Sequence, residues 1–427
     1  MVKMMKHPRR REFLPLIANL GLAARAQTIN GAPAPAAKYD LLIKGGRVID
    51  PSQSLSAVRD VAIAGNRIAK LADAIPETAA HAVVDARGRI VTPGLVDIHV
   101  HVYDGVAPLG IPADPNCIAK GATTVVDAGS AGAHTFPGFR RLVIDRVDTR
   151  IFALLNISVI GQSTLSDDNP WGELLELRYA NPKLAIRTIE QNRDVILGMK
   201  IRLSRSMSGN NDIPALRLAR EAADAVGLPL MIHAIDTASP FTDILKLLKN
   251  GDVITHAFHG HPGGILDGRR RVIPEVHKAI QDGVRLDVGH GRGSFSWQVM
   301  EAAMKQDVMP GTISSDLHQF NVTGPVFDLV TTLAKFLHLG MPLEKVIECA
   351  TINPARTFRF PNQPGTLREG SEADIAVFQI LEGDFEMFAS SLGGPLEKRI
   401  VHRKLLPVAT IKGGRLYGSA SIPVVHA

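Results

Sequence analysis

The stretch Val91–His101, which reads VTPGLVDIHVH, joins a short apolar strand to two histidines at its carboxyl end. Residues two apart in a β-strand point to the same face, so we expect the imidazoles of His99 and His101 to lie side by side. Two neutral imidazoles on one face can hold a divalent metal ion. Such a pair at the carboxyl end of a strand is typical of (β/α)8 barrels, which gather their chemistry at that end.

Four later segments repeat the pattern of a short apolar or β-branched run that ends in a residue able to bind metal. They read GMK, MIH, ITH and SSD, and they end at Lys200, His233, His256 and Asp316. A lone histidine at a strand end is more often a structural residue than a ligand, and a lone Asp316 could be a helix N-cap. Two such histidines on successive strands, together with the first pair, favour one shared metal centre.

The region from residue 91 to residue 361 alternates β patterns with helical ones, and this alternation predicts the fold class. Helical stretches such as Ile213–Val226 and Val299–Lys305 lie between the expected strands. Eight strands with helical crossovers in about 270 residues fit one α/β TIM barrel. The competing open, doubly wound sheet usually has a glycine-rich phosphate loop after its first strand, and none occurs here. The expected strands are Gly94–His101, Thr123–Ala128, Ile151–Ser158, Ile196–Ile201, Leu228–His233, Val253–His256, Arg285–Val288 and Thr312–Ser315.

Both ends of the chain carry short β runs joined by glycine turns, which predicts a second, all-β unit. The sequence IKGGRV at Ile43–Val48 is mirrored by IKGGRL at Ile411–Leu416. We therefore expect residues 27–90 and 362–427 to form one small β-sandwich beside the barrel of residues 91–361.

The first 26 residues have the composition of an export signal. A basic stretch with the pair Arg10-Arg11 precedes an apolar run, Leu14–Ala24, and the A-x-A sequence Ala24–Ala26. These are the parts of a secretory signal, and the paired arginines resemble its twin-arginine type. Because the apolar run is too short to span a bilayer, we expect a periplasmic protein that has no membrane partner once the signal is removed.

The distribution of charge argues against a nucleic acid partner. Of the formal net charge of +6, +5 lies in residues 1–26, so the rest of the chain is nearly neutral. Aromatic residues, on which bases would stack, make up only 5% of the chain. The two cysteines, Cys117 and Cys349, are too few for a disulfide framework.

Lys200 is the unusual member of the expected ligand set. Its apolar flanks argue against a surface position, yet a buried ammonium group beside metal ions would be repelled. Reaction with carbon dioxide would convert the amine to a carbamate, whose two oxygens and negative charge can bridge two metal ions. With Asp316 and a bridging hydroxide, the carbamate would bring the site close to neutrality.

These segments resemble the amidohydrolase superfamily, and more closely its deacetylase branch, which is related to dihydroorotase and D-aminoacylase. The resemblance rests on Val91–His101 and on GATTVVDAGSAG at 121–132, GMKIR at 198–202, RLDVGHG at 285–291 and SDLH at 315–318. It extends from about Tyr39 to the C-terminus. It implies two zinc ions bridged by carboxylated Lys200 and a hydroxide, with the remaining ligands His99, His101, His233, His256 and Asp316.

The expected function is hydrolysis of an acyl bond, amide or ester, in a small-molecule substrate. The metal-bridged hydroxide would attack the carbonyl carbon, and Asp316 would carry its proton to the leaving group. One alternative is a cyclic-amide hydrolase similar to dihydroorotase or hydantoinase, which would use the same metals. Another is an inactive barrel that binds a ligand, although such a chain would be expected to have lost some of the six ligand residues.

Several residues near the expected centre are candidates for substrate contacts. His290 lies between glycines just past the seventh strand, and Tyr103 follows the first histidine pair. His259 lies in a glycine-rich loop after His256, and His318 shares strand parity with Asp316. The sequence leaves the substrate, the metal in vivo and the oligomeric state open; barrels of this kind often pair, so a homo-oligomer would be unsurprising.

Overall fold

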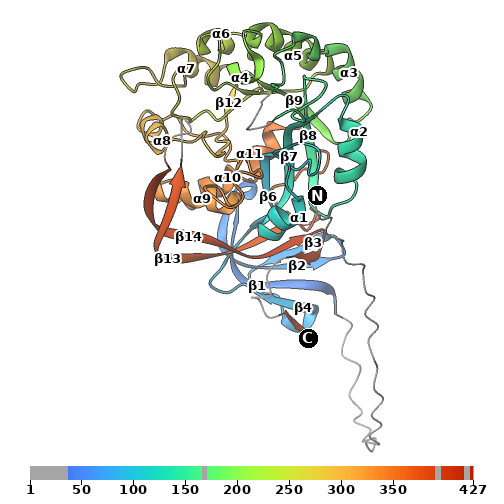
Figure 1. Ribbon diagram of the computed structural model, residues 1–427. Helices are drawn as coiled ribbons and strands as arrows, with labels where there is room; N and C mark the ends of the chain where they lie inside the picture. The colour runs from blue at the N-terminus through green and yellow to red at the C-terminus, as the bar shows by residue number, and fades with distance from the viewer. Residues whose placement is uncertain (1–36, 166–170, 390–395, 418–423, 427) are drawn as a thin grey trace, which may run out of the picture. The chain divides into compact units, whose positions relative to one another are not determined.

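The strands of the predicted barrel form a curled, seven-stranded parallel sheet in which each strand pairs with the next along the chain (Figure 1). The computed structural model describes residues 37–165, 171–389, 396–417 and 424–426. The predicted export signal, residues 1–26, lies outside the described residues. The barrel strands are β6 (Leu95–Val100), β7 (Ala122–Gly132), β8 (Arg150–Asn156), β9 (Ile196–Arg202), β10 (Leu230–His233), β11 (Val253–Thr255) and β12 (Arg285–Leu286).

The predicted eighth strand closes the ring through single bridges rather than through a continuous ladder. Thr312 pairs in parallel with Asp287 next to β12, and Leu317 pairs in parallel with Val100 of β6. The amide of His101 also donates to the carbonyl of Leu317 at 2.9 Å. Between these bridges Asp316 has a left-handed backbone, with φ of +49°, which interrupts an extended strand. The barrel expected from the sequence is confirmed, with this irregular eighth member.

Helices follow the barrel strands and cover their outer face. In α5 (Asp212–Val226), Ala215, Ala219, Ala222 and Val226 are buried at helical spacing, which is the apolar stripe of an amphipathic helix. This helix and α8 (Trp297–Met304) match two helices expected from the sequence to within two residues. The others are α1 (Ala113–Asn116), α2 (Phe136–Phe139), α3 (Pro182–Glu190), α4 (Arg205–Ser208), α6 (Phe241–Leu245), α7 (Pro274–Gln281), α9 (Leu329–His338), α10 (Leu343–Glu348) and α11 (Ile352–Thr357). Single turns of other helix types lie at Pro51–Gln53, Glu77–Ala79, Ile118–Lys120, Arg140–Ile144 and Leu177–Tyr179.

A second, nine-stranded mixed sheet is built from both ends of the chain, as the mirrored IKGGR sequences predict (Figure 1). Strand β5 pairs with β1 from the N-terminal part and with β13 from the C-terminal part, so it joins the two halves. The chain passes from this sheet into the barrel at Gly94. The strands are β1 (Tyr39–Asp50), β2 (Leu55–Ala64), β3 (Arg67–Ala72), β4 (Ala80–Asp85), β5 (Ile90–Pro93), β13 (Ile375–Ala389), β14 (Glu397–Lys412), β15 (Arg415–Tyr417) and β16 (Val424–His426).

Apolar side chains from six barrel strands meet in one cluster that supports the carboxyl ends of the strands. The cluster is closed by Phe358 and Phe360, which follow α11. Its strand members are Val96, Ile98, Val126, Ala128, Phe152, Leu154, Leu197, Met231 and Val253. Packing of this kind makes a barrel interior a filled core, so polar chemistry is confined to the strand ends. Within the described ranges, no helix has the length and apolarity needed to cross a membrane.

Candidate metal centre

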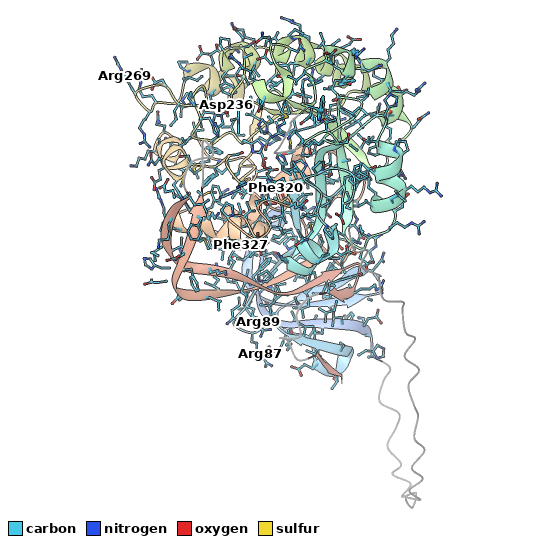
Figure 2. All side chains as sticks on the ribbon, in the orientation of Figure 1. Arg87, Arg89, Asp236, Arg269, Phe320 and Phe327 are labelled. Atoms are coloured by element: carbon cyan, nitrogen blue, oxygen red, sulfur yellow. The ribbon has the colours of Figure 1, made fainter. Side chains whose placement is uncertain are left out.

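All six residues predicted to bind metal line one cavity of about 220 Å³ at the carboxyl ends of the barrel strands. They are His99, His101, Lys200, His233, His256 and Asp316. Phe320, labelled in Figure 2, lines the same cavity. Each strand end therefore delivers its polar residue to a common point, as expected for a barrel.

His99, His101 and Asp316 form the tightest group in the cavity. Their ligand atoms all lie within 4.8 Å of one another. The Oδ1 atom of Asp316 is 3.3 Å from Nε2 of His99 and 3.1 Å from Nε2 of His101. All three residues are buried, so water does not screen this convergence of donor atoms.

The protonation of His99 is fixed by a relay through a buried threonine. The hydroxyl of Thr255 donates to Oδ2 of Asp287 at 2.8 Å, so its oxygen is left to accept a hydrogen bond. That oxygen lies 2.8 Å from Nδ1 of His99, which must therefore carry the proton. Nε2 of His99 is then unprotonated and faces the cavity, 3.4 Å from Nζ of Lys200, and this tautomer is the form that binds metal.

His101 and His256 are oriented in the same way. Ser130, bonded to the buried carboxylate of Asp127, accepts from Nδ1 of His101 at 2.9 Å. The carbonyl of Gly289 accepts from Nδ1 of His256 at 2.5 Å. Burial lowers the pKa of His256 to about 3 and that of His99 well below its usual value, so both imidazoles are neutral. His99 and His256 thus present unprotonated Nε2 atoms to one space, and Nε2 of His101 lies 3.1 Å from Oδ1 of Asp316.

His233 completes the histidine set from β10. Its Nε2 atom lies 3.1 Å from the hydroxyl of Ser204, which leaves Nδ1 as the atom able to bind metal. Its ring packs edge-on against His256, with centroids 4.4 Å apart. Burial holds the pKa of His233 well below its ordinary value, so this ring is also neutral.

Two of these residues have strained backbones. His256 and Asp316 have φ angles of +58° and +49°, in the left-handed region that residues other than glycine rarely adopt. Such conformations cost about 1–3 kcal/mol each and persist where the surrounding structure fixes them, often at functional sites. The strain lies at the two positions where a strand must turn its last side chain into the cavity.

Lys200 is buried in the cavity wall beside His99. Its Nζ atom lies 3.4 Å from Nε2 of His99 and 3.5 Å from Sδ of Met231. Among the described residues it forms no ion pair with a carboxylate. Burial lowers the pKa of Lys200 to about 8. Gly129 packs directly on this side chain, and a Cβ at Gly129 would lie 2.6 Å from Cγ of Lys200.

Asp97 joins the first strand to the eighth segment beneath the cavity. Its Oδ1 atom accepts from the amides of His99, at 3.2 Å, and Ser315, at 3.0 Å, and its Oδ2 atom accepts from the Ser315 hydroxyl. Burial raises the pKa of Asp97 to about 7. Asp97, two residues before His99, therefore links the backbone at His99 to Ser315, the neighbour of Asp316.

Three predicted substrate contacts do not line the cavity. Tyr103 donates its hydroxyl to the carbonyl of Thr135 at 3.0 Å and packs on Phe139. His259 accepts from the amide of His261 at 3.1 Å. His290 is fully buried, and both of its ring nitrogens are bonded within the protein. Each side chain is held behind the cavity wall by its own partners.

Other polar residues also line the cavity, among them Arg202, Gln162 and Arg292, which were given no individual role from the sequence. Arg202 lies two residues after Lys200 on β9, so strand parity alone could have indicated it. Gln162 and Arg292 come from loops and have no comparable signal. His318 also lines the cavity, and its Nδ1 accepts from the amide of Phe320, so Nε2–H is free to donate. Oε1 of Gln162 and Nε of Arg202 are buried without a hydrogen-bond partner.

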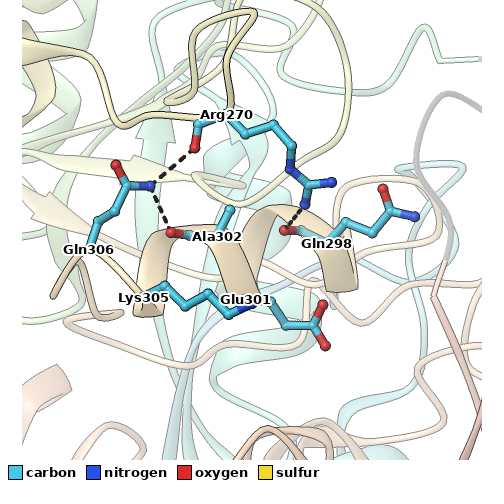
Figure 3. Close-up of a pocket in the computed structure, with 6 residues that line it drawn as sticks. All are labelled: Arg270, Gln298, Glu301, Ala302, Lys305 and Gln306. Carbon is cyan, nitrogen blue, oxygen red and sulfur yellow. Dashed lines mark hydrogen bonds between the residues drawn. The ribbon is translucent and has the colours of Figure 1, made fainter.

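A separate hollow of about 550 Å³ lies on the outer surface beside α8 (Figure 3). Arg270 donates to the carbonyl of Gln298 there, and Gln306 donates to the carbonyls of Arg270 and Ala302. Its lining contains one acidic residue, Glu301, and no imidazole. This hollow therefore lacks the donor set of a metal centre.

The donor set of the barrel cavity fits a divalent metal ion, with His99, His101 and Asp316 as its ligands. The Nε2 atoms of His99 and His101 lie 3.3 and 3.1 Å from Oδ1 of Asp316, so three atoms of the kinds that bind metal converge on one point. Imidazole nitrogens and carboxylate oxygens are ligands that suit zinc. The hydrogen bonds to Thr255, Ser130 and Gly289 are the outer partners that orient metal-binding histidines.

Replacing Thr255 with valine is expected to weaken zinc binding about 10- to 100-fold, because His99 loses the acceptor that fixes its tautomer. Thr188→Val is the matched control: it removes a buried threonine hydroxyl bonded to a helix carbonyl in α3. Competition with a chromophoric chelator would measure both affinities. An unchanged affinity in Thr255→Val would show that the relay from Asp287 does not orient His99.

Comparison with known proteins identifies one family, whose members differ in the reactions for which they are named. The model of the amidohydrolase family matches residues 90–401. A protein named deacetylase from Agrobacterium fabrum is 34% identical over 328 residues, which is 77% of this chain and 80% of that protein. A crystal structure of an adenine deaminase is similar with a TM-score of 0.81 and 33% identity, over 89% of this chain and 100% of that one. A crystal structure of a dihydroorotase has a TM-score of 0.79 and 31% identity, over 89% and 97%.

Proposed function

The chain belongs to the amidohydrolase family and is a hydrolase that acts on amide bonds, and from this premise we propose that it is a binuclear zinc deacylase. The substrate is a small molecule, and the bond cleaved is an acyl amide or ester. The observation that carries the proposal is the convergence of six ligand side chains on one cavity, with His99 and His256 held in the tautomer that binds metal.

The two metal positions would divide the ligands between them. His99, His101 and Asp316 would hold one zinc, because their ligand atoms already lie within 4.8 Å of one another. His233 and His256, whose rings are 4.4 Å apart, would hold the other. Carboxylated Lys200 would bridge the two and supply a negative charge. When bound, such a pair lowers the pKa of a shared water and polarises a carbonyl oxygen.

A carbamate at Lys200 is consistent with the surroundings of its amine. An ammonium group there would be buried beside neutral imidazoles without a carboxylate partner in the described part of the chain. Carboxylation joins the lysine nitrogen to the carbon of carbon dioxide and, starting from the ammonium form, releases two protons. The resulting anion replaces an unpaired buried cation and has two oxygens for ligation.

Different side chains of the cavity would transfer the proton, donate a hydrogen bond to the substrate and bind its charged group. Asp316 is buried and adjacent to both first-strand histidines, so it can accept a proton from the attacking water and return it to the leaving group. His318 presents an Nε2–H donor to the substrate. Arg292 lines the cavity together with Arg202, whose guanidinium group also pairs with buried Glu173 at 3.5 Å, and the two cations would favour a substrate with an anionic group. A volume of about 220 Å³ suits a small acyl compound.

The second candidate function is hydrolysis of a cyclic amide. It is favoured by the 31% identity to the crystallised dihydroorotase over nearly its whole length. A similar chain of known structure is named as an adenine deaminase, which is a different reaction, so overall similarity does not choose the substrate. The identity to the Agrobacterium deacetylase is the reason for ranking deacylation first.

A panel of acyl amino acids, acetyl esters, hydantoins and dihydroorotate would test the proposal on zinc-loaded protein. We expect turnover of acyl amino acids or acetyl esters that is lost on treatment with a chelator and restored by zinc. Reloading with magnesium is the control, because magnesium prefers oxygen ligands and should restore little activity. Preference for dihydroorotate or hydantoins would favour the cyclic-amide function. Turnover that survives complete removal of metal would contradict both.

A further inference from the structure

Lys335 is a second buried lysine, and it lies outside the metal cavity. It sits in α9 with no exposed surface, and its ammonium group has three hydrogen-bond partners. Nζ lies 3.0 Å from the carbonyl of Pro325, 2.7 Å from the carbonyl of Phe388 and 2.8 Å from Nε2 of His290. Three N–H donors thus meet three acceptors, and no carboxylate pairs with this cation among the described residues.

The hydrogen bond from Lys335 fixes which ring nitrogen of His290 carries the proton. Because Nε2 of His290 accepts from the ammonium group, Nδ1 must carry the ring proton, and it donates to the carbonyl of Gly291 at 2.9 Å. The ring also stacks on Phe295, with centroids 4.8 Å apart and planes inclined by 26°. His290 is therefore held by hydrogen bonds at both ring nitrogens and by stacking on one face of the ring.

The segment Gly289–Gly291, which His290 anchors, touches two proposed metal ligands. The carbonyl of Gly289 accepts from Nδ1 of His256 at 2.5 Å. A Cβ at Gly291 would lie 2.5 Å from Oδ2 of Asp316, and a Cβ at Gly289 would lie 2.8 Å from Nδ1 of His256. Both glycines have positive φ, +48° and +57°. This segment leaves no free space against either ligand, so a shift of its backbone would move both.

We propose that Lys335 is a positioning residue for the metal centre, acting through His290 and the Gly289–Gly291 segment on His256 and Asp316. The proposal rests on the metal-dependent function proposed above. It also gives the mixed sheet a role in catalysis, because Phe388 lies in β13, and its carbonyl is one of the three groups that hold the lysine.

The free-energy cost of burying the ammonium group of Lys335 favours a functional role for this residue. Burial lowers the pKa of Lys335 to about 7, which reflects the cost of keeping a cation away from water. An apolar residue of similar volume would often stabilise a fold as well or better than a buried charged group. What the ammonium group provides is three directed hydrogen bonds, which tie His290 to Pro325 and to Phe388 of β13.

Lys335→Met would test the role, with zinc affinity measured by competition with a chromophoric chelator. We expect zinc binding to weaken about 10- to 100-fold, the usual effect of losing an outer partner of a metal ligand, and kcat to fall more than KM changes. Lys44→Met is the matched control. It removes a lysine bonded to Asp60 and to the carbonyl of Ile75 in the mixed sheet, so it should lower the thermal midpoint of the metal-free protein and leave zinc affinity unchanged.

A second variant keeps the test decisive if Lys335→Met fails to fold. His290→Phe preserves the ring stacked on Phe295 and removes both ring nitrogens, and it should weaken zinc binding to a similar extent. Zinc affinities within twofold of wild type in every folded variant would overturn the role of Lys335. A wild-type protein that binds no zinc would instead overturn the proposed function, so the two failures are distinguishable.

Discussion

Lys200→Ala is expected to lower turnover by about 10³-fold or more, because losing the bridge removes several kcal/mol of charge stabilisation. The variant should also hold less zinc than wild type. Lys200→Arg should be equally inactive, since a guanidinium group keeps the positive charge and cannot form the carbamate. Rate assays with metal-saturated protein and elemental analysis of the same samples would measure both effects.

The control for this experiment is Lys183→Ala, which removes an exposed lysine at the start of α3. Short carboxylic acids such as formate or acetate should partly restore activity to Lys200→Ala, because they can place a carboxylate in the space the side chain leaves. Full turnover and full zinc content in Lys200→Ala would exclude the bridge.

Asp316→Asn is expected to lower kcat by about 10²- to 10⁴-fold while part of the bound metal is retained. The amide keeps one oxygen for ligation, but it cannot accept and return a proton. Its position supports this expectation, because Oδ1 lies 3.1–3.3 Å from the histidines of the first strand. Stopped-assay rates and zinc content, measured on the same preparation, would separate lost proton transfer from lost metal.

Asp236→Asn is a suitable control, because Asp236 is an exposed carboxylate hydrogen-bonded to His261 and does not line the cavity (Figure 2). It should retain kcat to within a few fold. An Asp316→Asn protein that keeps both metals and most of its turnover would show that another group moves the proton.

Much of the site was predictable because it follows strand geometry. His99 and His101 obey the period of two, and Lys200, His233, His256 and Asp316 end short apolar runs, so a parallel barrel must bring them to one edge. The mirrored IKGGR sequences likewise predicted that both chain ends contribute to one small β-sandwich, and the pairing of β1, β5, β13 and β14 is consistent with this.

The residues that escaped prediction depend on contacts between elements distant in sequence. His290 has the glycine-rich context of a substrate contact, yet Lys335 and Gly291 hold its ring behind the wall. Lys335 itself lies in an ordinary amphipathic pattern, and its burial arises because Pro325 and Phe388, from other parts of the chain, surround it. Gln162 and Arg292 reach the cavity from loops. Loops have no regular spacing of side chains, so the sequence does not indicate which of their residues point into the cavity. The export signal of residues 1–26 remains a prediction, which N-terminal sequencing of the mature protein would test.

The most direct measurement of the central claim is the metal content of wild-type protein expressed with zinc and bicarbonate. Elemental analysis against protein concentration should give two zinc ions per chain, and mass spectrometry of the native protein should show the added mass of one carboxyl group. A well-folded protein with one zinc or none, and with an unmodified Lys200, would contradict the account of a carbamate-bridged pair.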